Sequence, residues 1–140
     1  MKIGEIITCL THYRVIYGDT DQMGVVYYAN YLRWFESGRS EFLRQIGLPY
    51  ATIEQQGFHF PVTEVSCRYN RSARYDDLVR IETELVELGR ASLSFHYRIA
   101  RETQQALLAT GLSKHACVDH GGKLTRIPTI LLDAIKAAAR

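Results

Sequence analysis

The sequence lacks long apolar runs, and it lacks an excess of charge of either sign. No run reaches the roughly 18 to 20 apolar residues that a membrane-spanning helix needs, and the first residues do not form the apolar core of a secretory signal peptide. The formal net charge of +2 comes from acidic and basic residues scattered along the chain, so no basic stripe marks a nucleic-acid surface. We therefore expect a cytoplasmic protein with no membrane span and no nucleic-acid partner.

Cysteine is scarce, and so is any clustering of metal-binding side chains. Cys9, Cys67 and Cys117 are an odd number in separate strand-like contexts, which suits reduced thiols packed in a core better than a disulfide framework. No metal-ligand spacing such as His-Glu-x-x-His occurs among the five histidines, which are His12, His59, His96, His115 and His120. We expect neither a metal nor any other cofactor.

The chain does contain enough apolar side chain for one core. Its 140 residues are a usual length for one domain, and 46% of them are apolar, so we expect a single domain over residues 1–140. From Tyr28 to Ile46 apolar residues recur at spacings of three, four and seven, which predicts one long helix ending before Gly47. The small residues around Gly38 predict the close approach of another part of the chain.

Most of the remaining chain alternates apolar and polar residues, which is typical of half-buried antiparallel strands. The predicted elements, besides the long helix, are strands at Cys9–Tyr17, His59–Tyr69, Val79–Leu85, Leu93–Ile99 and Leu107–Val118, a short helical connection at Tyr50–Gln56, and a terminal helix at Thr129–Ala139. This order indicates an α+β fold, in which one helix covers a curved antiparallel five-stranded sheet. A single helix is too narrow for that sheet and both sheet edges need protection, so we expect at least a dimer.

The most informative segment is 17–31, Tyr-Gly-Asp-Thr-Asp-Gln-Met-Gly-Val-Val-Tyr-Tyr-Ala-Asn-Tyr. It sets Asp19, Asp21 and Gly24 in a tight loop ahead of the helix, whose first N–H groups are unpaired. Such donors can polarise a carbonyl while a carboxylate delivers a nucleophile, which is a layout for acyl transfer. Taken alone, the motif fits a helix cap or an ordered turn more often than a catalytic group. Asp19 is expected to order the loop, and Gly24 to allow an unusual backbone conformation or a close approach of substrate.

The segment resembles the hotdog-fold thioesterases, in particular the group of 4-hydroxybenzoyl-CoA thioesterase and the YbgC-like acyl-CoA thioesterases. The likeness continues through Arg33-Trp-Phe-Glu36, Gly47-Leu-Pro49, Ala73-Arg-Tyr-Asp-Asp77, Gly89-Arg-Ala-Ser92 and Arg126-Ile-Pro128, and so covers nearly the whole chain. It implies a sheet wrapped around one central helix and the hydrolysis of an acyl-CoA thioester to a carboxylic acid and CoA. It also implies active sites at a dimer interface, commonly with two dimers forming a homotetramer.

By this resemblance, Asp21 corresponds to the catalytic carboxylate and the Tyr28 backbone amide would hold the thioester oxygen. Tyr17 matches a tyrosine that YbgC-like enzymes use near the nucleophile, although a strand-end aromatic is an equally good reading. Many YbgC-like members have histidine where this chain has Tyr28, so a mechanism through that histidine is not expected here. Asp21 acts either as nucleophile or as the base that activates water, and the sequence does not separate these routes.

CoA carries several phosphate charges, and loop or strand-end arginines are candidates to bind them. Arg90 and Arg126 are favoured because they fall inside the matching segments, and Arg68 is a further candidate. Two other functions stay open at this point. One is a hotdog dehydratase or hydratase, which is disfavoured because no histidine lies between Gly18 and Gln56. The other is a non-catalytic module that binds acyl thioesters.

Overall fold

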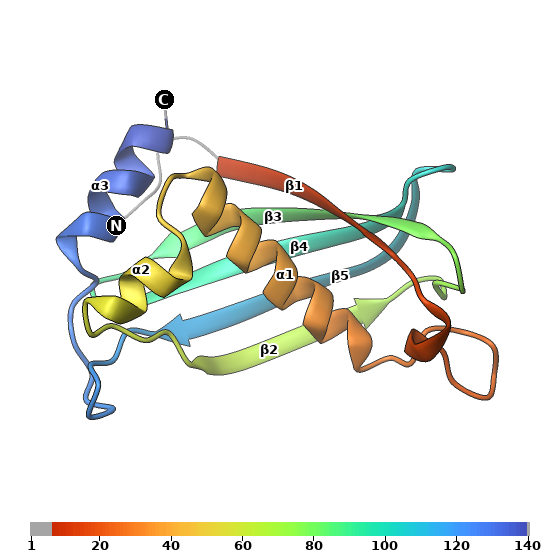
Figure 1. Ribbon diagram of the computed structural model, residues 1–140, viewed down its shortest axis with the longest axis horizontal. Coiled ribbons are helices and arrows are strands. Elements are labelled where there is room, and N and C mark those ends of the chain that lie inside the picture. The colour runs from red at the N-terminus through yellow and green to blue at the C-terminus, as the bar shows by residue number, and fades with distance from the viewer. Residues whose placement is uncertain (1–6, 140) are drawn as a thin grey trace.

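Five strands form one antiparallel sheet in the order β1-β3-β4-β5-β2 (Figure 1). The computed structural model describes residues 7–139. Its elements are β1 (Ile7–Arg14), the 3-10 turn η1 (Tyr17–Asp19), α1 (Asn30–Gln45), α2 (Tyr50–Gln55), β2 (Val62–Tyr69), β3 (Leu78–Leu88), β4 (Ser92–Arg101), β5 (Ala106–Ala116) and α3 (Thr129–Ala138). The predicted order of elements and the α+β class are confirmed.

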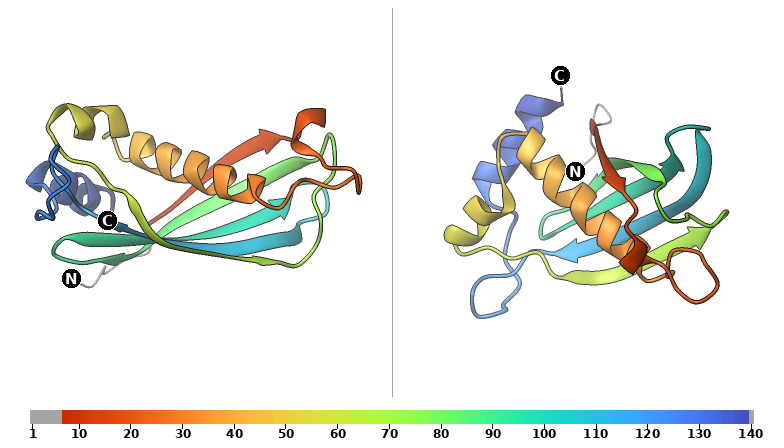
Figure 2. Two further views of the ribbon diagram at one scale, coloured as in Figure 1. Left: turned by 90° about the horizontal axis from the view of Figure 1, so that it is seen from below. Right: turned by 45° about the vertical axis from the view of Figure 1, so that its right-hand side comes forward.

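The long helix α1 lies across the concave face of the sheet, which curves beneath it (Figure 2). Its buried residues fall on one face at helical spacing, as an amphipathic helix on a sheet requires, and are Tyr31, Trp34, Phe35, Gly38, Phe42 and Leu43. Phe35 stacks on Tyr97 of β4, with ring centroids 4.3 Å apart and planes 7° apart. This contact lies at the centre of the core.

Glycine is needed at two points where α1 meets the sheet. A Cβ atom on Gly38 would overlap the Thr83 side chain of β3, so the close approach predicted around Gly38 is confirmed. A Cβ atom on Gly111 of β5 would overlap the Phe35 ring. Both glycines let the helix sit deep on the sheet, which fixes the position of its N-terminus.

Some predicted boundaries differ from the observed ones. The strand predicted at Cys9–Tyr17 ends at Arg14, because Asp19 draws the chain into η1 by accepting the Ile16 N–H. Tyr28 belongs to a turn that precedes α1, in which the Asn30 N–H donates to the Tyr27 carbonyl at 2.9 Å. The strand predicted from His59 begins at Val62. Before it, His59 forms only an isolated bridge to Val118.

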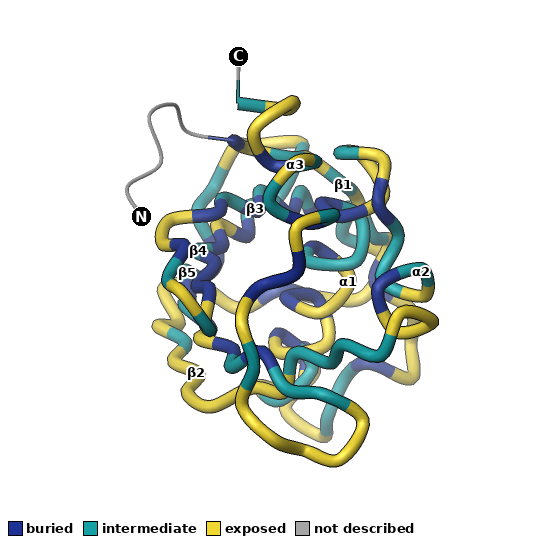
Figure 3. Tube along the Cα trace, turned by 90° about the vertical axis from the view of Figure 1, so that its left-hand side faces the viewer, coloured by how far each residue is buried: buried dark blue, intermediate teal, exposed yellow. Residues whose placement is uncertain are grey.

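The two edges of the sheet differ in what covers them. Nearly every residue of the edge strand β2 is exposed, including Val62, Val65 and Tyr69 (Figure 3). On the other edge strand, β1, exposed residues alternate with buried or half-buried ones. An edge strand with unpaired backbone groups favours pairing with another chain. The dimer expected from the sequence stays a prediction. Within residues 7–139, no helix is long and apolar enough to cross a membrane.

Candidate active site

Asp19 ties the end of β1 to the start of α1. Its carboxylate Oδ2 accepts hydrogen bonds from the Tyr13 hydroxyl at 2.7 Å and from the Ile16 N–H at 2.9 Å. Its backbone carbonyl accepts from the Asn30 side-chain amide at 2.8 Å and from the Tyr27 N–H at 2.9 Å. Asp19 is only 6% exposed, so these bonds are shielded from water. Asp19 thus has the loop-ordering role expected of it.

Asp21 lies in the tight turn that follows. The Gly24 N–H donates to the Asp21 carbonyl at 3.0 Å, and the Asp21 carboxylate Oδ1 accepts the Met23 N–H at 2.9 Å. Gly24 has φ +79°, and a Cβ there would meet no atom within 4 Å, so backbone conformation and not crowding explains the glycine. In the described part of the chain, no hydrogen bond occupies Oδ2 of Asp21. That oxygen is free for water or substrate.

Asp21 and Tyr28 line the same cleft, which has a volume of about 230 Å³. Asp21 lies nine positions ahead of α1 in sequence, but the loop folds back so that its carboxylate lies beside the turn before the helix. The cleft is lined by Asp21, Met23, Val25, Val26, Tyr28, Tyr31, Tyr69, Asn70, Arg71 and Ser72. It therefore combines one carboxylate, aromatic walls and one cationic side chain.

The backbone carbonyl of Tyr28 is held in place by Tyr69. The Tyr69 hydroxyl donates to the Tyr28 carbonyl at 2.8 Å, and its ring meets the Tyr28 and Tyr31 rings edge-on at 6.4 and 5.0 Å. Burial, with a further effect of the Cys67 side chain, raises the pKa of Tyr69, so its hydroxyl remains a donor at neutral pH. Among residues 7–139, the Tyr28 N–H has no acceptor. This N–H belongs to the preceding peptide, whose Tyr27 carbonyl accepts the Asn30 N–H at 2.9 Å. The backbone is thus held on both sides of Tyr28, and a fixed, free N–H is what an oxyanion donor requires.

Tyr17 lies apart from this cleft. Its side chain is 77% exposed and packs edge-on against Tyr75, with centroids 5.4 Å apart. The structure therefore brings Asp21, Gly24 and Tyr28 together and leaves the Tyr17 side chain on the outer side of the loop. A catalytic part for Tyr17 stays a prediction.

The arginines predicted to bind phosphate fall into two places. Arg90 and Arg126 line one hollow beside the start of α3, where the Ile127 N–H donates to the Arg90 carbonyl at 2.9 Å. Arg68 is exposed on β2 and lines neither this hollow nor the cleft. The strand β3 runs from the segment bordering the cleft to the hairpin of Arg90, and its 11 residues span about 33 Å. The residues that line the cleft and those that line the hollow thus lie toward opposite ends of the sheet. Figure 1 shows the loop before α1 at one end of the sheet and α3 at the other.

Residues 15–137 match the model of a protein family described as the thioesterase-like superfamily. The chain belongs to this superfamily. It is 41% identical over 109 residues to the acyl-CoA thioesterase YbgC of Haemophilus influenzae, covering 77% of this chain and 79% of the relative. It is 30% identical over 93 residues to 4-hydroxybenzoyl-CoA thioesterase of a Pseudomonas species, covering 64% and 66%.

Solved structures of thioesterases share the fold. A DHNA-CoA thioesterase from Staphylococcus aureus superposes with a TM-score of 0.88 at 29% identity, over 93% of this chain and 89% of that one. The hotdog fold expected from the sequence is therefore confirmed, and the superfamily places the chain among thioester hydrolases.

In this thioesterase, two supporting residues escape sequence reasoning. Tyr69 is the last residue of a strand, and nothing in the alternation of that strand shows that its hydroxyl reaches the Tyr28 peptide. Tyr13 resembles any half-buried strand aromatic, yet it holds the Asp19 carboxylate. In both cases the contact joins segments that only the fold brings together. Residues 7–139 contain no cluster of three or more His, Cys, Asp or Glu side chains that could hold a metal ion.

Proposed function

We propose that the protein hydrolyses acyl-CoA thioesters to a free carboxylic acid and CoA, with Asp21 as nucleophile or general base and the Tyr28 amide as oxyanion donor. The observation that carries the proposal is the shared cleft. Asp21, whose Oδ2 accepts no hydrogen bond from the described residues, lines it together with Tyr28, whose N–H has no acceptor among them. The names of the Haemophilus and Pseudomonas relatives support acyl-CoA as the substrate class.

The chemistry needs little beyond these two groups. Attack on the thioester carbonyl places negative charge on its oxygen, and one well-placed donor lowers such a barrier by about 3 to 4 kcal/mol. The CoA thiolate then leaves as the carbonyl re-forms, and it needs no strong general acid. In the covalent route Asp21 attacks and water hydrolyses the resulting anhydride. In the general-base route Asp21 takes the proton of the attacking water.

We further propose that the working form is a homodimer, or two dimers in a homotetramer, whose partner completes each site. Two features support this assembly. Arg90 and Arg126 lie at the opposite end of the sheet from Asp21. If the thioester of a bound CoA lies at Asp21, its phosphates would therefore be bound by the arginines of an adjacent copy. The exposed edge strand β2 offers a surface for pairing. Arg68, on this strand, would then lie near the subunit contact.

A dehydratase or hydratase is disfavoured because no histidine is among the residues that line the cleft. A non-catalytic binding module would retain the cleft but release no CoA. The deciding experiment measures CoA release with a thiol reagent over short, medium and long aliphatic acyl-CoAs and aromatic acyl-CoAs. The proposal predicts turnover of at least one class and its loss in Asp21→Asn. Saturable acyl-CoA binding without CoA release would favour the binding module.

The matched control is Asp133→Asn, which removes a carboxylate from α3, far from the cleft. It should leave turnover unchanged. The oligomer is tested separately by sedimentation at several protein concentrations, where a monomer at all concentrations would contradict the proposed assembly.

A further inference from the structure

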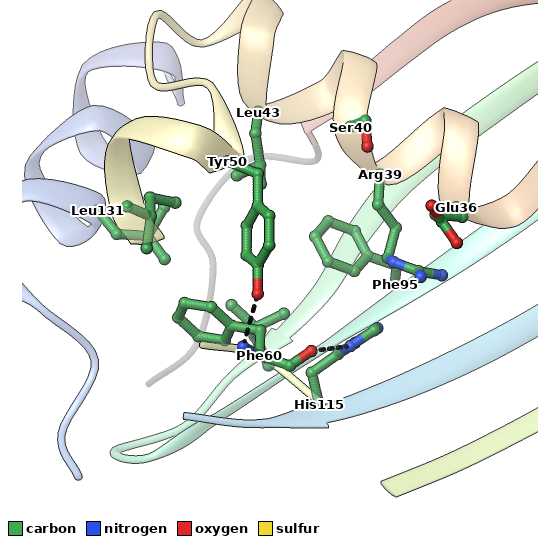
Figure 4. Close-up of a pocket in the computed structure, with 11 residues that line it drawn as sticks. Glu36, Arg39, Ser40, Leu43, Tyr50, Phe60, Phe95, His115 and Leu131 are labelled. Carbon is green, nitrogen blue, oxygen red and sulfur yellow. Dashed lines mark hydrogen bonds between the residues drawn. The ribbon is translucent and has the colours of Figure 1, made fainter. Parts of the chain in front are cut away.

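A second cavity lies between α1, α2, α3 and the sheet, and it shares no lining residue with the Asp21 cleft (Figure 4). Its volume is about 180 Å³. An apolar cavity of about 150 Å³ is enough to hold benzene. The walls are mostly apolar and come from Leu43, Ile53, Phe60, Leu93, Phe95 and Leu131. The space therefore suits an aromatic ring or a short aliphatic chain.

One wall of this cavity carries a relay of hydrogen bonds whose directions can be assigned. Burial lowers the pKa of His115 to about 4, so its ring is neutral at neutral pH and carries one proton. His115 Nδ1 lies 3.1 Å from the Phe60 carbonyl, which can only accept, so the proton is on Nδ1. His115 Nε2 must then accept from the Ser113 hydroxyl at 2.7 Å. Ser113 in turn accepts from the Tyr97 hydroxyl at 2.6 Å.

The relay ends at Arg39 of α1, whose Nη1 donates to the Tyr97 oxygen at 3.3 Å. Tyr97, Ser113 and His115 each have one proton to donate, and each donates it within the relay. A guanidinium has five N–H donors, so most of those of Arg39 remain unused. Within residues 7–139, no carboxylate lies within ion-pair distance of Arg39, and Glu36, which also lines the cavity, is exposed.

Tyr50 supplies a second donor to the cavity. Its hydroxyl oxygen accepts the Phe60 N–H at 3.0 Å, and in the described chain its hydroxyl proton has no acceptor. Figure 4 shows this hydroxyl pointing into the space that Phe60 and His115 border. Arg39 and Tyr50 both line this cavity. The cavity thus presents N–H and O–H donors to a mostly apolar interior. Among the described residues that line it, Glu36 carries the one carboxylate, and that carboxylate forms no ion pair with Arg39.

We propose that this cavity binds a small organic carboxylate, with its ring or short chain among the apolar walls and its carboxylate on Arg39 and Tyr50. An acceptor with negative charge matches the unused donors, and a charged hydrogen bond at a desolvated site is stronger than a neutral one. Such an acid could be the product of thioester hydrolysis or an unrelated metabolite. The binding site itself does not depend on the proposed function.

The test is titration of the intact protein with benzoate and hexanoate, followed by calorimetry and by protein NMR. Saturable binding is expected, with benzyl alcohol and 1-hexanol binding at least tenfold more weakly because they lack the charge. Arg39→Met should weaken benzoate binding at least tenfold, and Tyr50→Phe should weaken it severalfold. Arg44→Met removes an exposed arginine of the same helix and should have no effect.

A second pair of variants guards against misfolding of Arg39→Met. Ser40→Phe puts a ring into the cavity from its lining and should abolish binding, whereas Ser37→Phe, on the exposed side of α1, should not. Equal binding by Arg39→Met and Arg44→Met would overturn the proposal, as would equal binding of benzoate and benzyl alcohol. Chemical-shift changes centred on Arg90 and Arg126 would also overturn it.

Two further experiments distinguish the possible sources of the ligand and distinguish failure of this proposal from failure of the proposed hydrolysis. If the acid released from the preferred acyl-CoA binds more tightly than other acids of its size, the ligand is the product. If all compact acids bind alike, the site is general, and the proposal still stands. Asp21→Asn should retain benzoate binding whether or not it retains turnover, so failure of the proposed hydrolysis leaves this test intact.

Discussion

The bond from Tyr69 to the Tyr28 carbonyl gives a quantitative test of how the backbone that carries the oxyanion donor is positioned. Tyr69→Phe removes the hydroxyl that donates to the Tyr28 carbonyl at 2.8 Å and keeps the ring that walls the cleft. A single intramolecular hydrogen bond contributes about 0.5 to 1.5 kcal/mol net. If that energy is expressed in the transition state, kcat should fall about two- to tenfold. KM should change little, because the ring contacts persist.

The assay is steady-state CoA release from the preferred acyl-CoA, with single-turnover kinetics to isolate the chemical step. Tyr75→Phe removes an exposed hydroxyl outside the cleft and should leave kcat unchanged. An unchanged kcat in Tyr69→Phe would refute the positioning argument. A loss above a hundredfold would refute it as well, because a single positioning bond cannot account for that much, and Tyr69 would then act on the substrate itself.

Three further predictions concern stability. Asp19→Asn should cost about 1 to 3 kcal/mol in urea unfolding and lower kcat, because the buried carboxylate serves both Tyr13 and a backbone N–H. Gly38→Ala should destabilise by about 1 to 3 kcal/mol by overpacking against Thr83, and near-neutral unfolding would contradict that contact. The folded pKa of His115 lies near 4, below its ordinary 6.5. The unfolded chain therefore binds more protons, and stability should fall by up to about 3 kcal/mol as pH drops from 6.5 to 4. His115→Gln should flatten that dependence in urea titrations.

Local patterns were sufficient to predict most of the fold. The period-two strands and the helix that stops before Gly47 depend on neighbouring residues and on one buried face, so they can be inferred without tertiary contacts. The errors lie where a distant side chain intervenes. The Asp19 carboxylate ends β1 three residues earlier than the alternation indicates, and the turn before Asn30 shortens α1.

The candidate site was predictable only in part, and for the same reason. The motif and its family resemblance pointed to Asp21, Gly24 and Tyr28 as candidates. Asp21 and Tyr28 line one cleft and Gly24 bonds to Asp21, because the three are close in sequence. Tyr69 reaches Tyr28 across 41 positions, and no local pattern encodes such a contact. The relay from Arg39 to His115 likewise joins α1 to β4 and β5, so it emerges only from the assembled sheet.

The most direct test of the central claim is the single-turnover rate of CoA release by Asp21→Asn, beside wild type and Asp133→Asn, at a saturating concentration of the best acyl-CoA. Asparagine keeps the size of the side chain and its acceptor for the Met23 N–H, but it removes the charge and the basicity. The account predicts a loss of about a hundredfold or more, with circular dichroism unchanged and Asp133→Asn fully active. A rate in Asp21→Asn within a few-fold of wild type would contradict it.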